Sequence, residues 1–165
     1  MDRDNHAGKI DFLSYLGGFF DGEGYIGLGK QTLTTNGGSN ILPSVRLSNT
    51  DIRPLKFIHE KLTSLGIKCW LSSREGKRRT LRCKNGNFVK TIHDIGLSGK
   101  IQVKKFIQFV RPYVFVKGDQ LDVVTEFISL REKVMVGRGN RQGIGKAEYT
   151  KYEISLIEKL KVLKH

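Results

Sequence analysis

The sequence predicts an α+β domain in which helices cover one face of an antiparallel sheet. An apolar helical stretch is followed by two strand-like runs, and a second helix is followed by a further strand pair. The C-terminal third is helical in pattern. This order of elements is typical of helices segregated to one face of a sheet. A chain of 165 residues fits one domain, residues 1–165, and is long enough to bury a core.

The first helix is expected at about residues 9–21, where Leu13, Leu16 and Phe20 follow helical spacing. Strands are predicted at Tyr25–Leu33 and Ile41–Asn49, joined by a polar loop rich in turn-forming residues. Alternation along these strands places Ile26, Leu28, Val45 and Leu47 toward the core.

A second helix is expected at Arg53–Leu65, with Thr50 or Asp51 as its N-cap and Gly66 at its end. Four more helices are expected at residues 88–95, 100–110, 120–136 and 151–163, the last with a capping box of Thr150 and Glu153. The helices beyond about residue 118 form a C-terminal extension, residues 118–165.

Residues 68–84 read as a second hairpin that turns near Gly76, which would place Cys69 opposite Cys83 and Leu71 opposite Leu81. The other face of this hairpin would be basic. The two cysteines are either small buried hydrophobes or a disulfide, which is unusual inside cells. They are too few for a zinc site.

The net charge of +13 indicates a polyanionic partner, with nucleic acid ahead of an anionic membrane surface. Residues 67–84 carry seven basic side chains and one acidic side chain, which favours a contact surface over a solubility device. The loop at residues 137–146 contains four glycines and three basic residues, and is either a basic contact loop or a plain solvated linker.

The chain shows no signal-peptide pattern and no apolar run of the ~20 residues that a bilayer requires. We therefore expect no membrane partner and an intracellular location, in the cytoplasm or an organelle matrix, without secretion.

Residues 15–25 carry the chemistry, because an apolar helix there ends in two carboxylates, Asp21 and Glu23. Gly17 and Gly18 cost a helix ~1 kcal/mol each relative to Ala, and a close approach of another backbone would explain their presence. A carboxylate beside a basic surface repels phosphate unless a divalent cation such as Mg²⁺ lies between them and activates water. The alternative is that both acids only cap and solvate a turn.

This segment resembles the motif of the LAGLIDADG homing endonucleases. Leu16, Gly18, Asp21 and Gly24 match the motif letter for letter, and the intervening residues are replacements of a kind that the family accepts. The resemblance implies the family's α-β-β-α-β-β-α core with an antiparallel DNA-binding sheet, here with additional C-terminal helices. It also implies metal-dependent hydrolysis with Mg²⁺, for which Mn²⁺ can substitute.

The resemblance assigns roles to individual residues. Glu23 would be the metal-binding acid, the Gly22 carbonyl would be a neighbouring ligand, and Asp21 would cap the partner's motif helix. The segment 48–53 resembles the end of the family's second strand, so Asn49 and Arg53 would organise water and phosphate.

Residues 111–117 resemble the loop that brings a lysine to the active site, so Lys117 would stabilise the charged transition state. For Arg53 and Lys117 the alternative is an ordinary solvated side chain.

The motif occurs once, and single-motif family members act as homodimers, so Leu16, Gly17, Gly18 and Asp21 are expected at or beside a C2 interface. The implied function is a site-specific double-strand cut, with short 3′ overhangs, in a long pseudopalindromic DNA target. The alternatives are an intron RNA maturase and a non-catalytic DNA-binding regulator of the same fold.

The outward face of the sheet would contact DNA, because a two-stranded ribbon fits the major groove. Some of its side chains would read bases, and others would bind phosphate. With the basic loop included, the candidates are Gln31, Ser44, Arg46, Trp70, Arg74, Lys77, Arg78, Arg79, Arg82, Lys84, Arg138 and Arg141.

Overall fold

A four-stranded antiparallel sheet organises the protein. The computed structural model describes residues 11–32, 39–74, 91–136 and 149–164. Within these residues the strand order is β1-β2-β4-β3, as expected for an α+β chain. The strands are β1 (Gly24–Thr32), β2 (Ser39–Asn49), β3 (Trp70–Arg74) and β4 (Ile92–Ser98).

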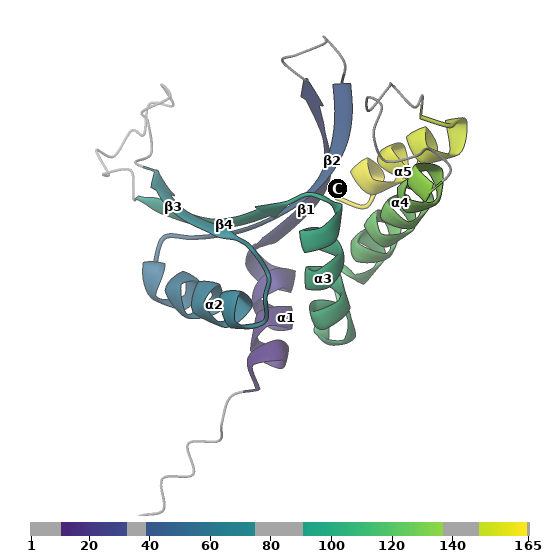
Figure 1. Ribbon diagram of the computed structural model, residues 1–165. Coiled ribbons are helices and arrows are strands. Elements are labelled where there is room, and N and C mark those ends of the chain that lie inside the picture. The colour runs from purple at the N-terminus through teal and green to yellow at the C-terminus, as the bar shows by residue number, and fades with distance from the viewer. Residues whose placement is uncertain (1–10, 33–38, 75–90, 137–148, 165) are drawn as a thin grey trace, which may run out of the picture.

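Helices cover only one face of this sheet. The described helices are α1 (Phe12–Glu23), α2 (Ile52–Ser64), α3 (Lys100–Val110), the short 3-10 helix η1 (Arg111–Tyr113), α4 (Gly118–Val136) and α5 (Lys151–Val162). In Figure 1 the sheet is curved, and α1, α2 and α3 lie on its convex side. Helices α4 and α5 lie beside the far end of the β1–β2 hairpin. No described helix combines the length and the apolar character needed to cross a bilayer.

The core lies between the sheet and its helices. Leu16 and Phe20 of α1 are fully buried, as are Ile26 of β1 and Leu47 of β2. The Phe20 ring meets the Phe106 ring of α3 edge to face, with 5.5 Å between centroids. The predicted inward set is confirmed, with Val45 also buried and Leu28 partly buried against the same cluster.

Several predicted helix ends are confirmed by hydrogen bonds. Asp51 caps α2 by accepting from the Arg53 amide at 2.9 Å, and Gly66 follows the helix with a φ of +72°. Thr150 and Glu153 form the expected capping box of α5. Helix α1 begins at Phe12, three residues after the predicted start, and continues through Glu23.

The predicted helix at residues 88–95 is wrong, because residues 92–98 form strand β4. Leu71 pairs with Ile95 of β4, a pairing that the sequence did not predict, while Leu81, its predicted partner, lies outside the described residues. In this strand Ile95 and Leu97 alternate with Asp94, Gly96 and Ser98, which is the period of a strand with one buried face.

Cys83 lies outside the described residues, so the predicted Cys69–Cys83 pairing stays a prediction. Cys69 itself is partly buried, and burial raises the pKa of its thiol above the ordinary value.

Helix α1 is tied to η1 and to the segment that follows it by two close contacts. A Cβ atom on Gly17 would overlap the Tyr113 backbone, so glycine is required there. The Asp21 carboxylate accepts hydrogen bonds from the amides of Phe115 at 2.7 Å, Val116 at 3.1 Å and Lys117 at 3.0 Å. Burial raises the pKa of Asp21, but the amides and the Lys117 charge outweigh burial and hold the pKa below its usual value.

The Asp21→Asn variant should destabilise the protein, because an amide NH₂ group would face N–H donors in place of a carboxylate oxygen. We expect the free energy of unfolding at pH 7 to fall by about 1–2 kcal/mol. A depressed pKa stabilises the fold above the unfolded-state pKa, and this contribution is lost as pH falls through the folded-state pKa.

The difference between wild type and variant should therefore shrink below about pH 4. Urea unfolding at several pH values measures it. A difference that does not change with pH would show that the Asp21 charge contributes nothing.

Candidate active site and nucleic-acid interface

The junction between α1 and β1 brings an acid and a lysine together. Glu23, the last residue of α1, is exposed, and Gly24 begins β1. The Lys117 Nζ donates hydrogen bonds to the carbonyl oxygens of Phe20 at 3.0 Å and Gly24 at 2.6 Å. The ammonium group therefore lies at the C-terminal end of α1, where the helix dipole favours a cation. The structure thus places Lys117 beside the motif segment.

Two opposing effects act on the pKa of Lys117. Burial lowers its pKa below the ordinary lysine value, while the carboxylates of Asp21 and Glu23 act in the opposite direction. The Lys117 side chain is therefore partly withdrawn from water and lies within the electrostatic reach of both motif acids.

Asn49 is the last residue of β2, and Arg53 lies in the first turn of α2 at the same end of the sheet. Gly24 pairs with Leu47, so the start of β1 lies beside the end of β2. The Asn49 Oδ1 accepts from the Asp51 amide at 2.8 Å, which orders the turn into α2. Arg53 forms a two-nitrogen contact with the Asp51 carboxylate and keeps its side chain 88% exposed. Hydrogen bonding to Arg53 holds the pKa of Asp51 at about 2.

The oxygen donors at this junction suit a hard cation shared with a phosphate. Across the described residues, no group of three or more His, Cys, Asp or Glu side chains gathers in one place. One chain therefore offers the exposed Glu23 carboxylate together with backbone carbonyls. Gly22 is exposed and has open space where a side chain would stand. Mg²⁺ commonly binds through one or two carboxylates, with water and substrate phosphate as the remaining ligands.

The two adjacent glycines of α1 face different surroundings. Gly17 is buried against Tyr113 of the same chain, and Leu16 lies in the core. Gly18 is exposed, with nothing within 4 Å of the position that its Cβ would take. Both oxygens of Asp21 are engaged within the chain, whereas the resemblance had implied a contact with a partner's helix. Of these two glycines, Gly18 is thus the one that intrachain packing leaves unexplained.

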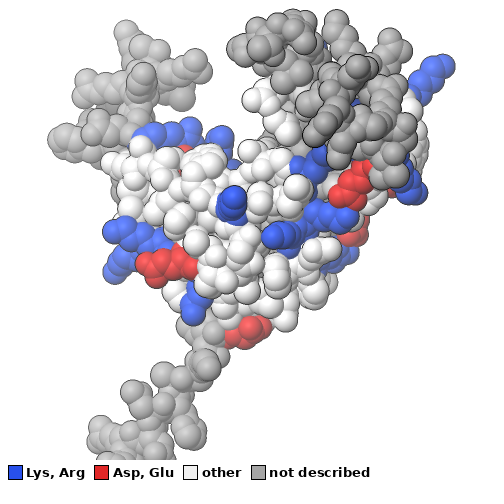
Figure 2. Space-filling model, viewed as in Figure 1, with Lys and Arg blue, Asp and Glu red and all other residues white. Residues whose placement is uncertain are grey.

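A hollow of about 630 Å³ lies on the sheet face opposite α1, α2 and α3. One row of paired residues crosses it, with Tyr25, Arg46, Gly96 and Trp70 on successive strands. The Trp70 ring covers Gly96, where a side chain would collide with it. Figure 2 shows basic side chains along the rim beside β3, while most acidic side chains visible in that view lie over the helices. The lining residues are Tyr25, Ser44, Val45, Arg46, Ser48, Trp70, Arg74, Leu97 and Ser98.

Arg74 differs from Arg46 in having a buried acidic partner. Its Nε lies 2.9 Å from an oxygen of Asp94, a residue of β4 that is 3% exposed. The Ser48 hydroxyl donates to the same carboxylate. Arg46 is exposed in the hollow. Sequence reasoning missed Asp94 because it read this segment as a helix, although the strand period of residues 92–98 was a usable signal.

The other predicted contact residues divide into two groups. Gln31 and Trp70 are exposed and Ser44 is half-buried, in agreement with an outward face. The remaining candidates lie outside the described residues, and they are Lys77, Arg78, Arg79, Arg82, Lys84, Arg138 and Arg141.

Comparison by sequence finds no matching family model and no matching curated protein. Comparison by structure does find relatives. The homing endonuclease I-CvuI, in complex with the I-CreI target, shares 15% identity at a TM-score of 0.51, covering 93% of this chain and 94% of that chain. The archaeal intron-encoded homing endonuclease I-Vdi141I, complexed with DNA, gives 15% identity and a TM-score of 0.53, with 91% and 96% covered.

A third comparison concerns chain length. A double mutant of I-SmaMI matches with 12% identity and a TM-score of 0.60 over 98% of this chain but only 46% of that chain. The present chain therefore spans about half of that protein and nearly all of I-CvuI and I-Vdi141I. The chain has the fold of the LAGLIDADG homing endonucleases, and the motif of its sequence forms the junction between α1 and β1.

Proposed function

We propose that this protein is a homodimeric, metal-dependent DNA endonuclease that makes a double-strand cut with short 3′ overhangs in a long pseudopalindromic target. The observation that carries the proposal is the exposed Glu23 at the α1–β1 junction, with the Lys117 ammonium anchored on the adjoining backbone. The solved relatives of the same fold include homing endonucleases in complex with DNA, one of them with Mg²⁺ and one with Ca²⁺.

Each residue at the junction has a different role in the proposed reaction. Glu23 and the Gly22 carbonyl would hold Mg²⁺, for which Mn²⁺ can substitute, and the bound metal would activate water and stabilise the leaving oxygen. Lys117 balances negative charge on the phosphate undergoing attack. Asn49 and Arg53 orient the water and the neighbouring phosphate, and the Asp51 contact limits the motion of Arg53.

The proposal requires a second copy of the chain, because one junction would serve one DNA strand. The Gly18 face of α1 is open to a second helix. Beside the end of this helix, Phe115 and Val116 are 94% and 72% exposed, an apolar surface that a second copy would cover. A twofold axis between two such helices would place two Glu23 residues on opposite strands of a near-palindromic site.

Cleavage of a randomised DNA library tests the proposal directly. Wild-type protein with Mg²⁺ should yield double-strand cuts at one long site, and EDTA should abolish them. Tight binding without cleavage in either condition would favour a DNA-binding regulator. Preferential binding of structured intron RNA would favour a maturase.

Glu23→Gln should abolish cleavage and retain DNA binding, because the amide cannot hold the metal but leaves the sheet surface intact. We expect a loss of at least about 100-fold in the cleavage rate. Glu60→Gln, an exposed acid on α2, is the matched control and should cut at the wild-type rate. A Glu23→Gln protein that cuts as fast as wild type would remove Glu23 from the mechanism.

Gly18→Leu should weaken the dimer, because the added side chain meets nothing in its own chain and would separate two closely packed helices. Analytical ultracentrifugation should show a shift toward monomer at the same protein concentration, with an unchanged circular dichroism spectrum. The control is Gln108→Leu, which adds an exposed leucine on α3. An equally dimeric Gly18→Leu protein would place the interface elsewhere.

Arg46→Ala should relax sequence discrimination more than it weakens phosphate binding, because Arg46 projects from the middle of the sheet. We expect a loss of ~1–3 kcal/mol in the preference for the target over a site changed at the contacted base pair. Lys56→Ala on α2 should leave this preference unchanged. Equal weakening on target and scrambled DNA would show that Arg46 contacts only phosphate.

A further inference from the structure

The far half of the β1–β2 hairpin has no third strand beside it in the described part of the sheet. Strand β2 pairs with β4 only from Ser44 to Asn49, whereas it pairs with β1 from Ser39 onward. Gln31 lies in this half, opposite Asn40. A two-stranded ribbon is marginally stable by itself, and its outer edge presents unpaired backbone groups. Something else must therefore hold this half in a fixed direction.

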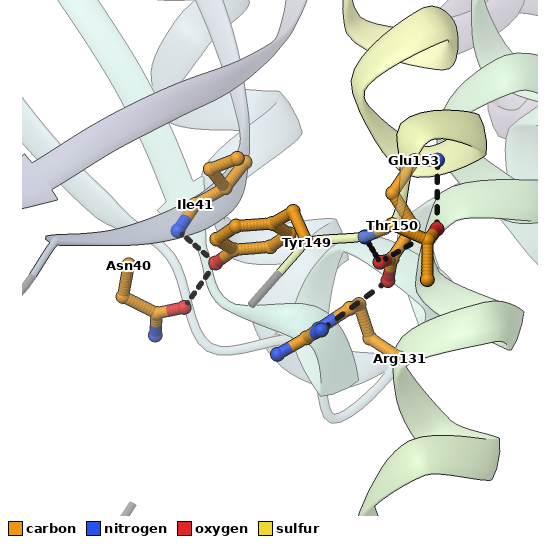
Figure 3. A network of polar contacts seen from close by, with 6 residues as sticks. All are labelled: Asn40, Ile41, Arg131, Tyr149, Thr150 and Glu153. Atoms are coloured by element: carbon orange, nitrogen blue, oxygen red, sulfur yellow. Dashed lines mark hydrogen bonds and ion pairs between the residues drawn. The ribbon is translucent and has the colours of Figure 1, made fainter. Parts of the chain in front are cut away.

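The phenol group of Tyr149 occupies the outer edge of the ribbon (Figure 3). Its oxygen accepts a hydrogen bond from the Ile41 amide at 2.7 Å and donates to the Asn40 Oδ1 at 2.8 Å. Ile41 lies 108 positions before Tyr149 in the chain. Both hydrogen-bonding roles of the hydroxyl are thus used on two adjacent residues of β2, which fixes the contact along the strand.

The Tyr149 ring is held in turn by α4. Its plane lies nearly parallel to the Phe127 ring, with 6.2 Å between centroids and an angle of 20°. The Arg131 guanidinium lies 4.5 Å from the centroid of the tyrosine ring. Phe127 and Arg131 are one helical turn apart on the same face of α4, and Phe127 is fully buried.

A buried carboxylate fixes the start of α5 against α4. Glu153 is 1% exposed, and its Oε1 lies 3.3 Å from Arg131. Its Oε2 accepts from the Thr150 amide at 2.7 Å and from the Thr150 hydroxyl at 3.1 Å. A buried charge requires such partners, so Arg131 links the capping box of α5 to the ring of Tyr149 (Figure 3).

The other end of α5 contacts the base of the same hairpin. The Lys164 Nζ lies 4.1 Å from the centroid of the Tyr25 ring, and the Gln120 side chain of α4 donates to the Leu163 carbonyl at 2.9 Å. The segment 149–164 therefore contacts β2 at Asn40 and Ile41 and β1 at Tyr25. These contacts connect α4 and α5 to both ends of the ribbon.

We propose that α4 and α5 form a brace that sets the direction of the β1–β2 ribbon, and that Tyr149 is a positioning residue for base reading by its far half. This inference rests on the proposed DNA binding. The Tyr149 hydroxyl fixes the direction of β2, because its two hydrogen bonds have a defined length and resist sliding and tilting of the strand. An apolar contact would not resist these movements.

Tyr149→Phe tests the brace, since it removes the hydroxyl and keeps the ring between α4 and β2. Tyr152→Phe is the matched control, because the Tyr152 hydroxyl also joins α5 to α4, through Glu126, without contacting the sheet. The first readout is amide hydrogen exchange of Ile41 by NMR on the full-length protein. Exchange should accelerate at least roughly tenfold in Tyr149→Phe and stay at the wild-type rate in Tyr152→Phe.

The second readout is base discrimination along the DNA target selected by the wild-type protein. In Tyr149→Phe, the penalty for a mismatch at the base pairs farthest from the cut should fall about 3- to 10-fold. Mismatch penalties near the cut, and the cleavage rate at saturating DNA, should keep their wild-type values. A general loss of stability would lower the mismatch penalties at all base pairs together and would not produce a difference between the far and the near base pairs.

Three results would overturn the brace: an unchanged Ile41 exchange rate, faster exchange with unchanged discrimination, or the same gradient in Tyr152→Phe. Wild-type protein that binds no DNA sequence would instead overturn the proposed function, and the role in base reading with it. The exchange measurement distinguishes the two failures, because it reports the Tyr149–Ile41 contact without DNA.

Discussion

The contact on which the candidate site depends is the set of three hydrogen bonds from the amides of residues 115–117 to the Asp21 carboxylate. These bonds fix the backbone of Lys117 against the end of α1, from which its Nζ reaches the Phe20 and Gly24 carbonyls. The approach is possible only because Gly17 leaves room for Tyr113. One motif segment therefore determines both the bend into β1 and the position of the lysine.

This arrangement separates the tasks of two neighbouring acids. Asp21 is an acceptor whose pKa the surrounding amides and Lys117 hold low, so it stays ionised and structural. Glu23 is exposed at the junction and keeps its carboxylate for an external ligand. On a helix, side chains two residues apart do not face each other, so the two acids meet different surroundings. Asp21 packs into the fold, whereas Glu23 remains exposed for the metal and phosphate chemistry that we propose.

Local signals predicted the first half of the fold well, because α1, β1, β2 and α2 follow clear apolar periods and Asp51 is a strong cap. Strand β4 was misread although Ile95 and Leu97 alternate with polar or small residues, because the pairing that makes it a strand joins it to β2 and β3 over long sequence distances. The same limit applies at the site. The position of Lys117 was predicted from a resemblance. Other contacts join segments that are distant in the sequence and leave no local pattern, namely the amide partners of Asp21, the Asp94–Arg74 pair and the Tyr149 contact.

In the proposed function, cutting and base reading share one strand, because β1 starts at the Glu23 junction and carries Gln31 near its far end. The seven residue steps from Gly24 to Gln31 span about 23 Å. A tilt of about 5° at the base would displace the far end by about 2 Å, more than a hydrogen bond to a base edge tolerates. Sheet pairing with β4 stiffens only the near half of the ribbon. The contacts of Tyr149 on one end and Lys164 on the other supply a second support, so under the proposed brace the helices beyond residue 118 would contribute to the geometry of recognition.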